Sequence, residues 1–395
     1  MRRLRRLAVG WAMLADTIPL YPLYALLFAD AGLSDARISS LLVIWTAVGI
    51  VAEVPAGVLA DRFSRRAAIV ASGLFQAAGY AVWMTAPGYA GFAAGFVLWG
   101  VGGAFASGAL EALLYDAMDA LGAADHYLGV YGRVTAVGLA CQLPAAAAAT
   151  ALFAAGSYAL VGWVSVGCCV ASAALATRLP EVRPVAERRD PGAEAEQGAG
   201  SGRGYGAVLR AGLSEAARRP GVRAAIVAVA LLAGLDGLEE YFPLLARQWG
   251  VATAAVPLAM VAVPLTGAAG AALGGVAGNL RARTLGLLVA GAVGVFAAAG
   301  LLRRPAGVAG IAVAYGVFQL VLVVGDARLQ RRIEGPARAT VTSVAAFGTE
   351  VSAMAVIGIW ALGRPLLVAG AALAVAAALP WLLRPNAADA TRAPE

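Results

Sequence analysis

The feature that most constrains this sequence is a succession of apolar stretches separated by short polar or arginine-containing segments. A helix of about 20 apolar residues spans the hydrocarbon core of a bilayer. Apolar residues make up 61% of the chain and charged residues 13%, which leaves too little polar surface for a water-soluble fold of this size. We therefore interpret the chain as an all-α integral membrane protein. A soluble enzyme, a disordered chain and a disulfide-bonded secreted scaffold are excluded.

Twelve stretches have a suitable length, six on each side of one long polar segment at 179–219 that is rich in Pro, Gly and charges. This arrangement predicts two six-helix bundles, 1–178 and 220–395, joined by a cytoplasmic linker with a short surface helix near 206–219. The twelve stretches run over 8–29, 38–60, 67–86, 90–118, 128–154, 157–178, 221–245, 251–279, 284–302, 306–328, 338–361 and 365–384.

The arginine distribution predicts the orientation. With both termini in the cytoplasm, 24 arginines fall in inner segments and five in outer segments, while Arg133 falls inside the fifth stretch. Such an excess on one side is the positive-inside signal of membrane proteins. Anionic lipid then accounts for the net charge of +7, and nucleic-acid binding is not needed. We predict a monomeric, multi-pass protein of the cytoplasmic membrane with lipid, protons and a small-molecule substrate as partners.

The loop after the second stretch carries a motif, Gly57-Val-Leu-Ala-Asp-Arg-Phe-Ser-Arg-Arg66. It resembles the loop signature of the major facilitator superfamily, with Ser64 where a second glycine is usual. The resemblance implies twelve helices, two bundles that rock about a midplane site, and a transport function. It also implies a conformational latch made by Gly57, Asp61, Arg62, Arg65 and Arg66. The alternative is that these arginines only anchor the topology.

Two longer runs resemble one branch of the same superfamily. They are Glu53-Val-Pro-Ala-Gly57 in the second stretch and Ser107-Gly-Ala-Leu-Glu-Ala-Leu-Leu-Tyr-Asp116 in the fourth. The antiporter signature of the fifth stretch is absent, because Gln142 and Leu143 occupy its Gly-Pro position. The resemblance therefore supports the superfamily more strongly than its drug/proton antiporters.

Carboxylates inside the apolar stretches are the main candidate functional groups. A charge at the centre of a membrane helix costs about 2.5–3.5 kcal/mol or more, so such residues are functional candidates by default. We expect them to line a central cavity and to take up protons or bind a cationic substrate; the alternative is that they are capped or paired and serve packing. They are Asp16, Glu53, Glu111, Asp236 and Glu350, while Glu239 and Glu240 are interpreted as interfacial.

The fourth stretch predicts a lining for that cavity. Trp99, Gly103, Ser107, Glu111 and Tyr115 recur every four residues, which would place them on one face of a continuous helix. Close helix packing is the alternative explanation of this stripe. Tyr21, Tyr24 and Gln319 complete the predicted lining, and Asp116 is expected to form an ion pair with Arg133.

The sequence predicts a secondary active transporter and no enzyme. It contains no phosphate-binding loop and no metal-ligand constellation, so neither cofactor nor metal is expected. The carboxylates within the apolar stretches and the shortage of arginine there favour proton-coupled efflux of hydrophobic or cationic small molecules. Uptake or facilitated passage of a small metabolite is the alternative. A non-transporting receptor or assembly factor with the same fold is a further one.

Overall fold

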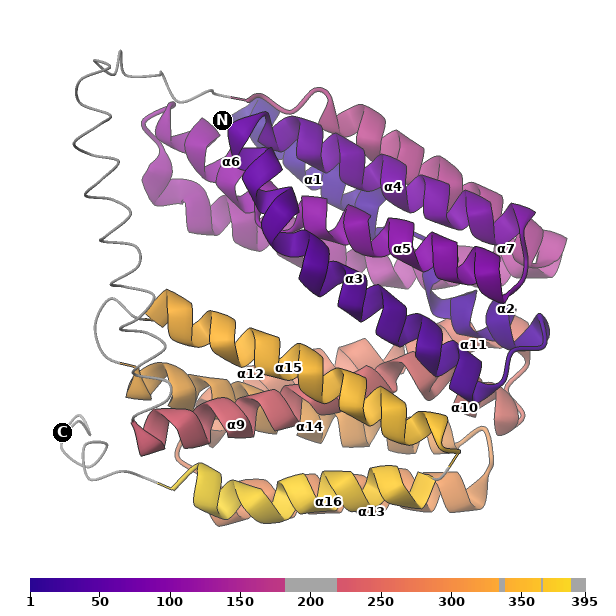
Figure 1. Cartoon of the computed structure of the whole chain (residues 1–395), viewed down its shortest axis with the longest axis vertical. Helices are drawn as coiled ribbons and strands as arrows, with labels where there is room; N and C mark the ends of the chain where they lie inside the picture. The colour runs from indigo at the N-terminus through magenta and orange to yellow at the C-terminus, as the bar shows by residue number, and fades with distance from the viewer. Residues whose placement is uncertain (182–218, 334–337, 364, 385–395) are drawn as a thin grey trace. The chain divides into compact units, whose positions relative to one another are not determined.

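The structure is a computed structural model that describes residues 1–181, 219–333, 338–363 and 365–384 (Figure 1). Every regular element in these ranges is helical, as predicted for an all-α protein. The chain divides into two compact units. Unit 1 comprises Met1–Ala186 with Val251–Val261, and unit 2 comprises Glu187–Gly250 with Ala262–Glu395. Most of the predicted linker, including the surface helix near 206–219, lies outside the described residues.

Ten described segments are helical, long enough and apolar enough to cross a membrane, and Leu367–Leu382 is a shorter apolar helix. These ten segments do not fix the number of membrane crossings, because one of them contains two of the predicted stretches. Twelve crossings therefore stay a prediction. The ten are Arg2–Asp30, Asp35–Arg62, Arg65–Thr85, Tyr89–Asp119, Ala124–Ala176, Pro220–Gln248, Thr253–Ala277, Ala282–Leu302, Gly307–Arg332 and Val341–Ala361.

Helix α7 (Tyr127–Ala176) is the segment that contains two stretches. Its backbone is not helical at Gly156 and at Ser157, which has φ 54° and ψ −158°. Val130 in the first arm and Ala176 at the end of the second belong to the same hydrophobic cluster, so the chain reverses between them. The two arms lie antiparallel and match the predicted stretches 128–154 and 157–178.

Unit 1 contains two further helix interruptions that the sequence explains locally. Pro19 and Pro22 lie between α1 and α2, where the chain forms a 3-10 turn instead of a continuous helix. Gly108 has φ 69°, a left-handed conformation suited to glycine, and it separates α5 from α6. The other elements are α1 (Arg2–Asp16), η1 (Tyr21–Leu23), α2 (Tyr24–Asp30), α3 (Asp35–Arg62), α4 (Arg65–Thr85), α5 (Tyr89–Ala106), α6 (Ala109–Asp119) and η2 (Ala124–His126).

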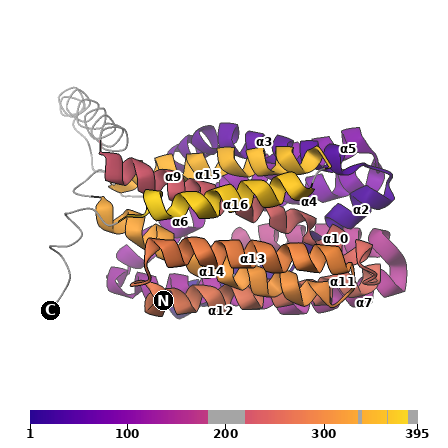
Figure 2. The ribbon, with the colours of Figure 1, turned by 90° about the horizontal axis from the view of Figure 1, so that it is seen from below.

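Unit 2 contains a closely packed helix pair, α12 and α14. Thr266 of α12 donates its hydroxyl to the Ala312 carbonyl of α14 at 2.6 Å, and a Cβ on Gly270 would overlap the Gly316 carbonyl oxygen. Figure 2 shows α13 beside α14 in the same unit. The elements are α9 (Pro220–Gly234), η3 (Leu235–Tyr241), α10 (Phe242–Gln248), α12 (Ala262–Ala277), α13 (Ala282–Leu302), α14 (Gly307–Arg332), α15 (Arg338–Ala361) and α16 (Pro365–Leu382). Two short elements, η4 (Thr253–Ala255) and α11 (Val256–Met260), precede α12 in the chain and belong to unit 1.

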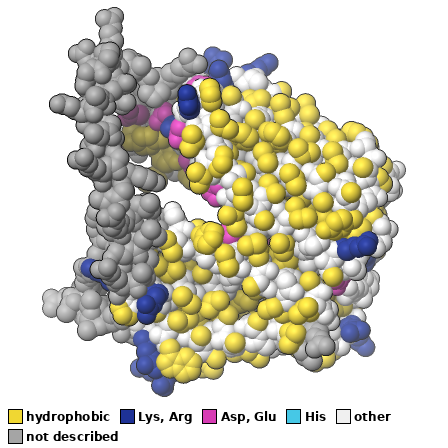
Figure 3. Space-filling view, viewed as in Figure 1, with side chains coloured by type: hydrophobic (Ala, Val, Ile, Leu, Met, Phe, Trp, Pro, Cys, Tyr) yellow, Lys and Arg dark blue, Asp and Glu magenta, His cyan; other side chains and the backbone are white. Residues whose placement is uncertain are grey.

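One hydrophobic cluster of unit 1 gathers residues that are far apart in the sequence. Leu4, Ala60, Met118, Val130 and Leu179 all belong to it. These residues adjoin the loops and the terminus that the arginine pattern places on the inner side of the membrane. Those segments therefore share one end of unit 1, although the position of a bilayer stays a prediction. Hydrophobic side chains cover most of the visible surface, and arginines gather in a few places (Figure 3).

The structure corrects two predicted spans. The first helix begins at Arg2, so the four N-terminal arginines lie within α1 and not before it. The fourth stretch, predicted as one overlong helix, is divided at Ser107 and Gly108 into α5 and α6. Both corrections have the same origin: hydropathy measures the length of an apolar run and does not register where its backbone departs from helical geometry.

Candidate functional site

Asp16 lies where the first span of unit 1 is interrupted. It is the last residue of α1, followed by Thr17 with non-helical backbone angles. A Cβ on Gly138 of α7 would lie 3.1 Å from the Asp16 Cγ and would overlap its Oδ2. The carboxyl therefore lies directly against the bare backbone of α7. Because the C-terminal end of a helix carries partial negative charge, this position does not stabilise an ionised carboxylate.

The first span of unit 2 is interrupted in the same way. α9 ends at Gly234, and the 3-10 segment η3 carries both Asp236 and Glu239. A Cβ on Gly234 would overlap the Ser352 side chain of α15 and lie 2.9 Å from the backbone nitrogen of Ala353. The break thus brings two carboxyls to the middle of the segment Pro220–Gln248. Discontinuous helices of this kind form ligand sites in many transporters.

A hydrogen-bond chain connects this break to α14. The Gln319 amide donates to the Tyr315 hydroxyl oxygen at 2.8 Å, and the Tyr315 hydroxyl donates to Glu239 Oε2 at 3.1 Å. Asp236 also interacts with the Tyr315 hydroxyl, while its Oδ1 is buried with no hydrogen-bond partner in the described part of the chain. Gly267 of α12 makes room for the ring, because a Cβ there would lie 2.7 Å from a Tyr315 ring carbon. Gln319, predicted to line a cavity, belongs to this chain.

Glu111 lies in the first turn of α6 among tyrosines. The Tyr131 hydroxyl of α7 donates to Glu111 Oε1 at 2.7 Å. The Tyr127 ring stacks on that of Tyr131, with centroids 5.6 Å apart and planes 8° apart. Tyr115 contacts Tyr127 edge to face at 5.5 Å. Three rings from two helices therefore form one connected group, and Tyr131 joins this group to the carboxyl.

The two remaining predicted carboxylates have different surroundings. Glu53, exposed on α3, accepts a hydrogen bond of 3.4 Å from Ser107 at the break between α5 and α6. Glu350 is an exposed residue of α15 in unit 2. Within unit 1, the structure places Glu53 beside Ser107 and Glu111 beside Tyr131, whereas Asp16 lies against Gly138. Each predicted carboxylate of unit 1 thus has its own neighbour, and Glu53 and Glu111 both lie at the break between α5 and α6.

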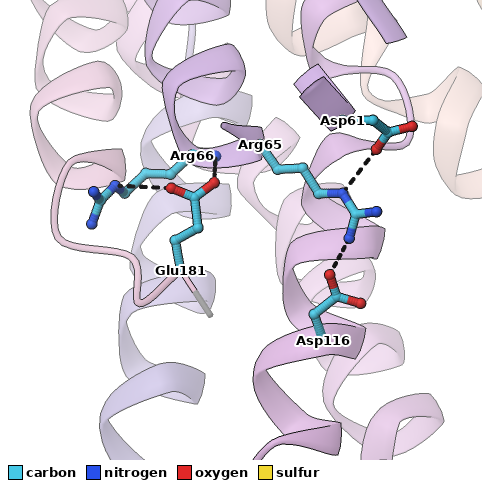
Figure 4. A network of polar contacts seen from close by, with 5 residues as sticks. All are labelled: Asp61, Arg65, Arg66, Asp116 and Glu181. Atoms are coloured by element: carbon cyan, nitrogen blue, oxygen red, sulfur yellow. Dashed lines mark hydrogen bonds and ion pairs between the residues drawn. The ribbon is translucent and has the colours of Figure 1, made fainter. Parts of the chain in front are cut away.

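The residues where α3 ends and α4 begins make three ion pairs inside unit 1 (Figure 4). Arg65 pairs with Asp61 at 3.1 Å and also with Asp116 of α6. Arg66 pairs with Glu181 at 3.9 Å, and its backbone N–H donates to the same carboxylate at 3.2 Å. Together these contacts link α3, α4, α6 and the segment that follows α7.

Ser64, which replaces the usual glycine of the loop motif, has two roles in this network. Its hydroxyl oxygen accepts the Ala67 N–H at 2.9 Å as the N-cap of α4, and the hydroxyl donates to Glu181 at 2.7 Å. Of the other motif residues, Gly57 has open space where a Cβ would be, and Arg62 is exposed beside the Phe63 ring. Glu181 was not singled out by the sequence, because it lies at the start of a polar segment.

The predicted ion pair between Asp116 and Arg133 is wrong. Asp116 pairs with Arg65, and Arg133 is exposed on α7 with no ion pair among the described residues. The prediction matched the two residues by depth along their helices. Arg65 begins α4 next to the end of α6, so it reaches Asp116 from a loop that depth alone does not consider.

The structure places the residues of the predicted aromatic lining in different surroundings. Tyr24 is 3% exposed and packs against Phe28, Trp83 and Phe96, so it belongs to the core. Tyr21 is 47% exposed and stacks on the buried Trp99 at 5.9 Å. The predicted stripe from Trp99 to Tyr115 is not continuous, because the backbone break at Gly108 divides it.

Sequence reasoning missed several polar partners. Tyr127 and Tyr131 contact the Glu111 region, and Tyr315 with Glu239 forms the network of unit 2. Glu239 was interpreted as interfacial, and the structure gives it an interhelical hydrogen bond instead. The available signal was the tyrosine pair with a spacing of four in the fifth stretch, which places both rings on one helix face. In the described residues, no group of three or more His, Cys, Asp or Glu side chains could hold a metal ion.

Comparison with known proteins places these features in context. The sequence model described as Major Facilitator Superfamily matches residues 7–356. The fold is similar to that of the nucleoside transporter NupG, with a TM-score of 0.73, 10% identity, and 97% and 98% of the two chains covered. A bacterial homologue of the iron transporter ferroportin in an inward-facing state has a TM-score of 0.72 and 12% identity, with 97% of this chain and 98% of that chain covered. A D-xylose-proton symporter has a TM-score of 0.65 and 14% identity, with 97% of this chain and 96% of that chain covered. No curated protein matches the sequence.

Proposed function

Since this chain belongs to the major facilitator superfamily and is a membrane transporter, we propose that it exports hydrophobic or cationic small molecules in exchange for protons. The observation that carries the proposal is a set of carboxyls in membrane-spanning segments without a positive partner. Among the described residues, no ion pair involves Asp16, Glu53, Glu111 or Asp236.

The free-energy cost of placing a carboxylate in a bilayer suggests how these residues would couple the two movements. An ionised carboxylate at membrane depth needs a proton, a hydrogen-bond network or a bound cation to offset its loss of hydration. When the binding of an organic cation and the binding of a proton to these carboxyls exclude each other, the two ions are moved in opposite directions. The same lack of span arginines makes the site unsuited to phosphate esters and dicarboxylates, which usually require arginine or lysine.

The two interrupted spans supply the proposed proton sites. In unit 1 the candidate is Asp16, which has no hydrogen bond in the described residues and lies at the unfavourable end of a helix. In unit 2 the candidate is Asp236 with Glu239, for which Tyr315 and Gln319 provide a short hydrogen-bond chain. The loop contacts of Asp61, Arg65 and Arg66 are proposed as the latch, since movement of α6 against α4 must break the pair between Arg65 and Asp116.

One observation favours the alternative, uptake of a polar metabolite. The chain from Gln319 through Tyr315 to Glu239 presents donors and acceptors of the kind that neutral, hydroxyl-rich solutes bind. The named neighbours include a nucleoside transporter and a sugar symporter, and at 10% and 14% identity they share only the fold. Under this alternative, substrate and proton move in the same direction.

Transport by purified protein in liposomes tests the proposal. Tritiated tetraphenylphosphonium serves as the cation probe, a trapped pH dye reports protons, and potassium with valinomycin clamps the membrane potential. An outward proton gradient should drive uptake of the probe with matching alkalinisation inside. Asp16→Asn and Asp236→Asn should each lower the initial rate about tenfold or more, which corresponds to about 1.4 kcal/mol in the barrier.

The matched control is Asp125→Asn, the same substitution at an exposed residue of η2. It should retain the full rate. Unchanged rates in both carboxyl variants, or probe movement without any proton movement, would contradict proton coupling. A gradient that drives labelled nucleoside or xylose inward together with protons would favour the uptake alternative.

A further inference from the structure

The group around Glu111 has features of a binding site that the transport proposal does not require. Its tyrosines come from two helices: Tyr115 from α6, one turn after Glu111, and Tyr127 and Tyr131 from the first arm of α7. Tyr115 is 49% exposed, while Glu111, Tyr127 and Tyr131 are half-buried. An aromatic surface with a carboxyl at its edge is therefore accessible from outside the helices of unit 1.

The electrostatics of this group favour a positive ligand. The face of a phenol ring carries negative potential, and a carboxylate adds a full negative charge beside it. Among the described residues, Glu111 has no ion pair, and its one hydrogen-bond donor is the Tyr131 hydroxyl on Oε1. The nearest charged pair on the same helix is already complete, because Asp116 is bound by Arg65.

The composition of the group selects among cations. A metal ion prefers a shell of several oxygen or nitrogen ligands, and one carboxyl with phenol rings does not provide it. Ring faces instead bind cations that are large, weakly hydrated and apolar, such as quaternary ammonium groups. The hydrogen bond from Tyr131 holds one oxygen of Glu111 and leaves the other without a hydrogen-bond donor among the described residues.

We propose that Glu111, Tyr115, Tyr127 and Tyr131 form a recognition site in unit 1 for an apolar organic monocation, of the quaternary ammonium or phosphonium class. This inference deepens the proposed function and rests on it for its biological meaning. It assigns recognition of the substrate charge to α6 and α7, and leaves the proton to Asp16 and Asp236. It also gives roles to Tyr127 and Tyr131.

Equilibrium binding to the purified full-length protein, without any gradient, tests the site. The probe is tritiated tetraphenylphosphonium, and triphenylphosphine oxide serves as a neutral competitor with similar rings. Glu111→Gln should weaken binding of the probe about tenfold or more. Tyr115→Leu and Tyr127→Leu should each weaken it about three- to tenfold, whereas Tyr115→Phe retains the ring and should bind within about twofold of the wild type.

Tyr89→Leu is the matched control, because it removes an exposed tyrosine from the start of α5, away from Glu111 in the chain. It should leave the affinity unchanged. Size-exclusion profiles and melting curves show whether each variant is folded. If Glu111→Gln is not, the two tyrosine variants carry the test.

The outcomes separate this inference from the proposed function. Unchanged affinity in Glu111→Gln and in both leucine variants would overturn the recognition site, even if proton-coupled transport is intact. Competition by the neutral compound as strong as by the unlabelled cation would overturn it too. A loss of probe binding in Glu111→Gln, together with wild-type transport that does not depend on the pH gradient, would support the site and contradict proton coupling.

Discussion

The first span of unit 1 and the first span of unit 2 share one backbone plan. Each has a helix of 15 residues, α1 or α9, then a break with a 3-10 segment, then a helix of seven residues, α2 or α10. The helices are offset by 218 residues, from 2 to 220 and from 24 to 242. Such a parallel repeat is a known architecture among transporters, and here it extends to the position of the break.

The side chains at the two breaks differ. In unit 1 the last residue of the long helix is Asp16, which faces Gly138. In unit 2 that place is taken by Gly234, which faces Ser352, and the carboxyl comes two residues later as Asp236. The interruption thus occurs at equivalent positions in the two units, whereas the polar groups occur at different ones. The two halves therefore carry different chemistry on equivalent backbones, and each break needs its own test.

The largest expected difference concerns the two glycines. Gly234→Ala would press a methyl group against the Ser352 side chain and the backbone of Ala353, which cannot rotate away. We expect it to lower the free energy of unfolding by about 1–3 kcal/mol, as overpacking does in other cores. Gly138→Ala meets only the Asp16 carboxyl, which can rotate, so its effect on stability should be smaller and its effect on proton-coupled transport larger.

Melting temperatures in detergent and transport in liposomes measure both effects. Gly294→Ala is the control, since open space surrounds that position in α13. It should not destabilise the protein and should leave transport unchanged. Equal destabilisation by Gly138→Ala and Gly234→Ala would mean that the two breaks are packed alike, contrary to the comparison.

A second, intermediate effect concerns the hydrogen-bond chain that only unit 2 has at its break. Tyr315→Phe keeps the ring and removes the hydroxyl between Gln319 and Glu239. The loss of such a hydrogen bond costs about 0.5–1.5 kcal/mol, so transport of the cation probe should fall about two- to tenfold. Tyr89→Phe, at an exposed tyrosine of unit 1, should have no effect. A fully active Tyr315→Phe protein would show that these hydrogen bonds serve the structure and not transport.

The smallest expected effect concerns the loops that follow the second span of each unit. α4 begins with Ser64 as its N-cap, whereas α13 begins after Arg281 with no side-chain cap. Both Ser64→Ala and Ser64→Gly lose the hydrogen bond to Glu181; loss of the cap should lower the free energy of unfolding by a further amount of about 1 kcal/mol in the alanine variant and only about a few tenths in the glycine variant. Chemical denaturation or melting curves measure this. A larger loss in the glycine variant than in the alanine variant would contradict the capping role.

Much of the fold could be predicted from the sequence, because each membrane span requires about 20 apolar residues, and such runs can be counted along the chain. The apolar runs predicted the membrane class and most span limits, and the loop motif at 57–66 indicated the family. The break at Gly108 could not be predicted, since it is one of 49 glycines and most of them are compatible with membrane helices.

The candidate site could be predicted less well than the fold. The carboxylates stood out because they are rare within apolar runs. Their partners depend on which helices touch and how each is rotated, as the pairing of Asp116 with Arg65 and of Glu111 with Tyr131 shows. Depth along a helix carries no information on rotation, so it favoured Arg133 as the partner of Asp116.

Arg332 has a consequence for the order in which the chain is made. Its guanidinium, buried at the end of α14, donates to the carbonyls of Gly221, Leu382 and Arg384. Two of these acceptors lie about fifty residues further along the chain, so they are synthesised last. Until residue 384 has left the ribosome, this arginine has only part of its hydrogen bonds. A chain that stops before Leu382 would leave this buried cation without its hydrogen bonds to Leu382 and Arg384, and such a loss is costly for a buried charge.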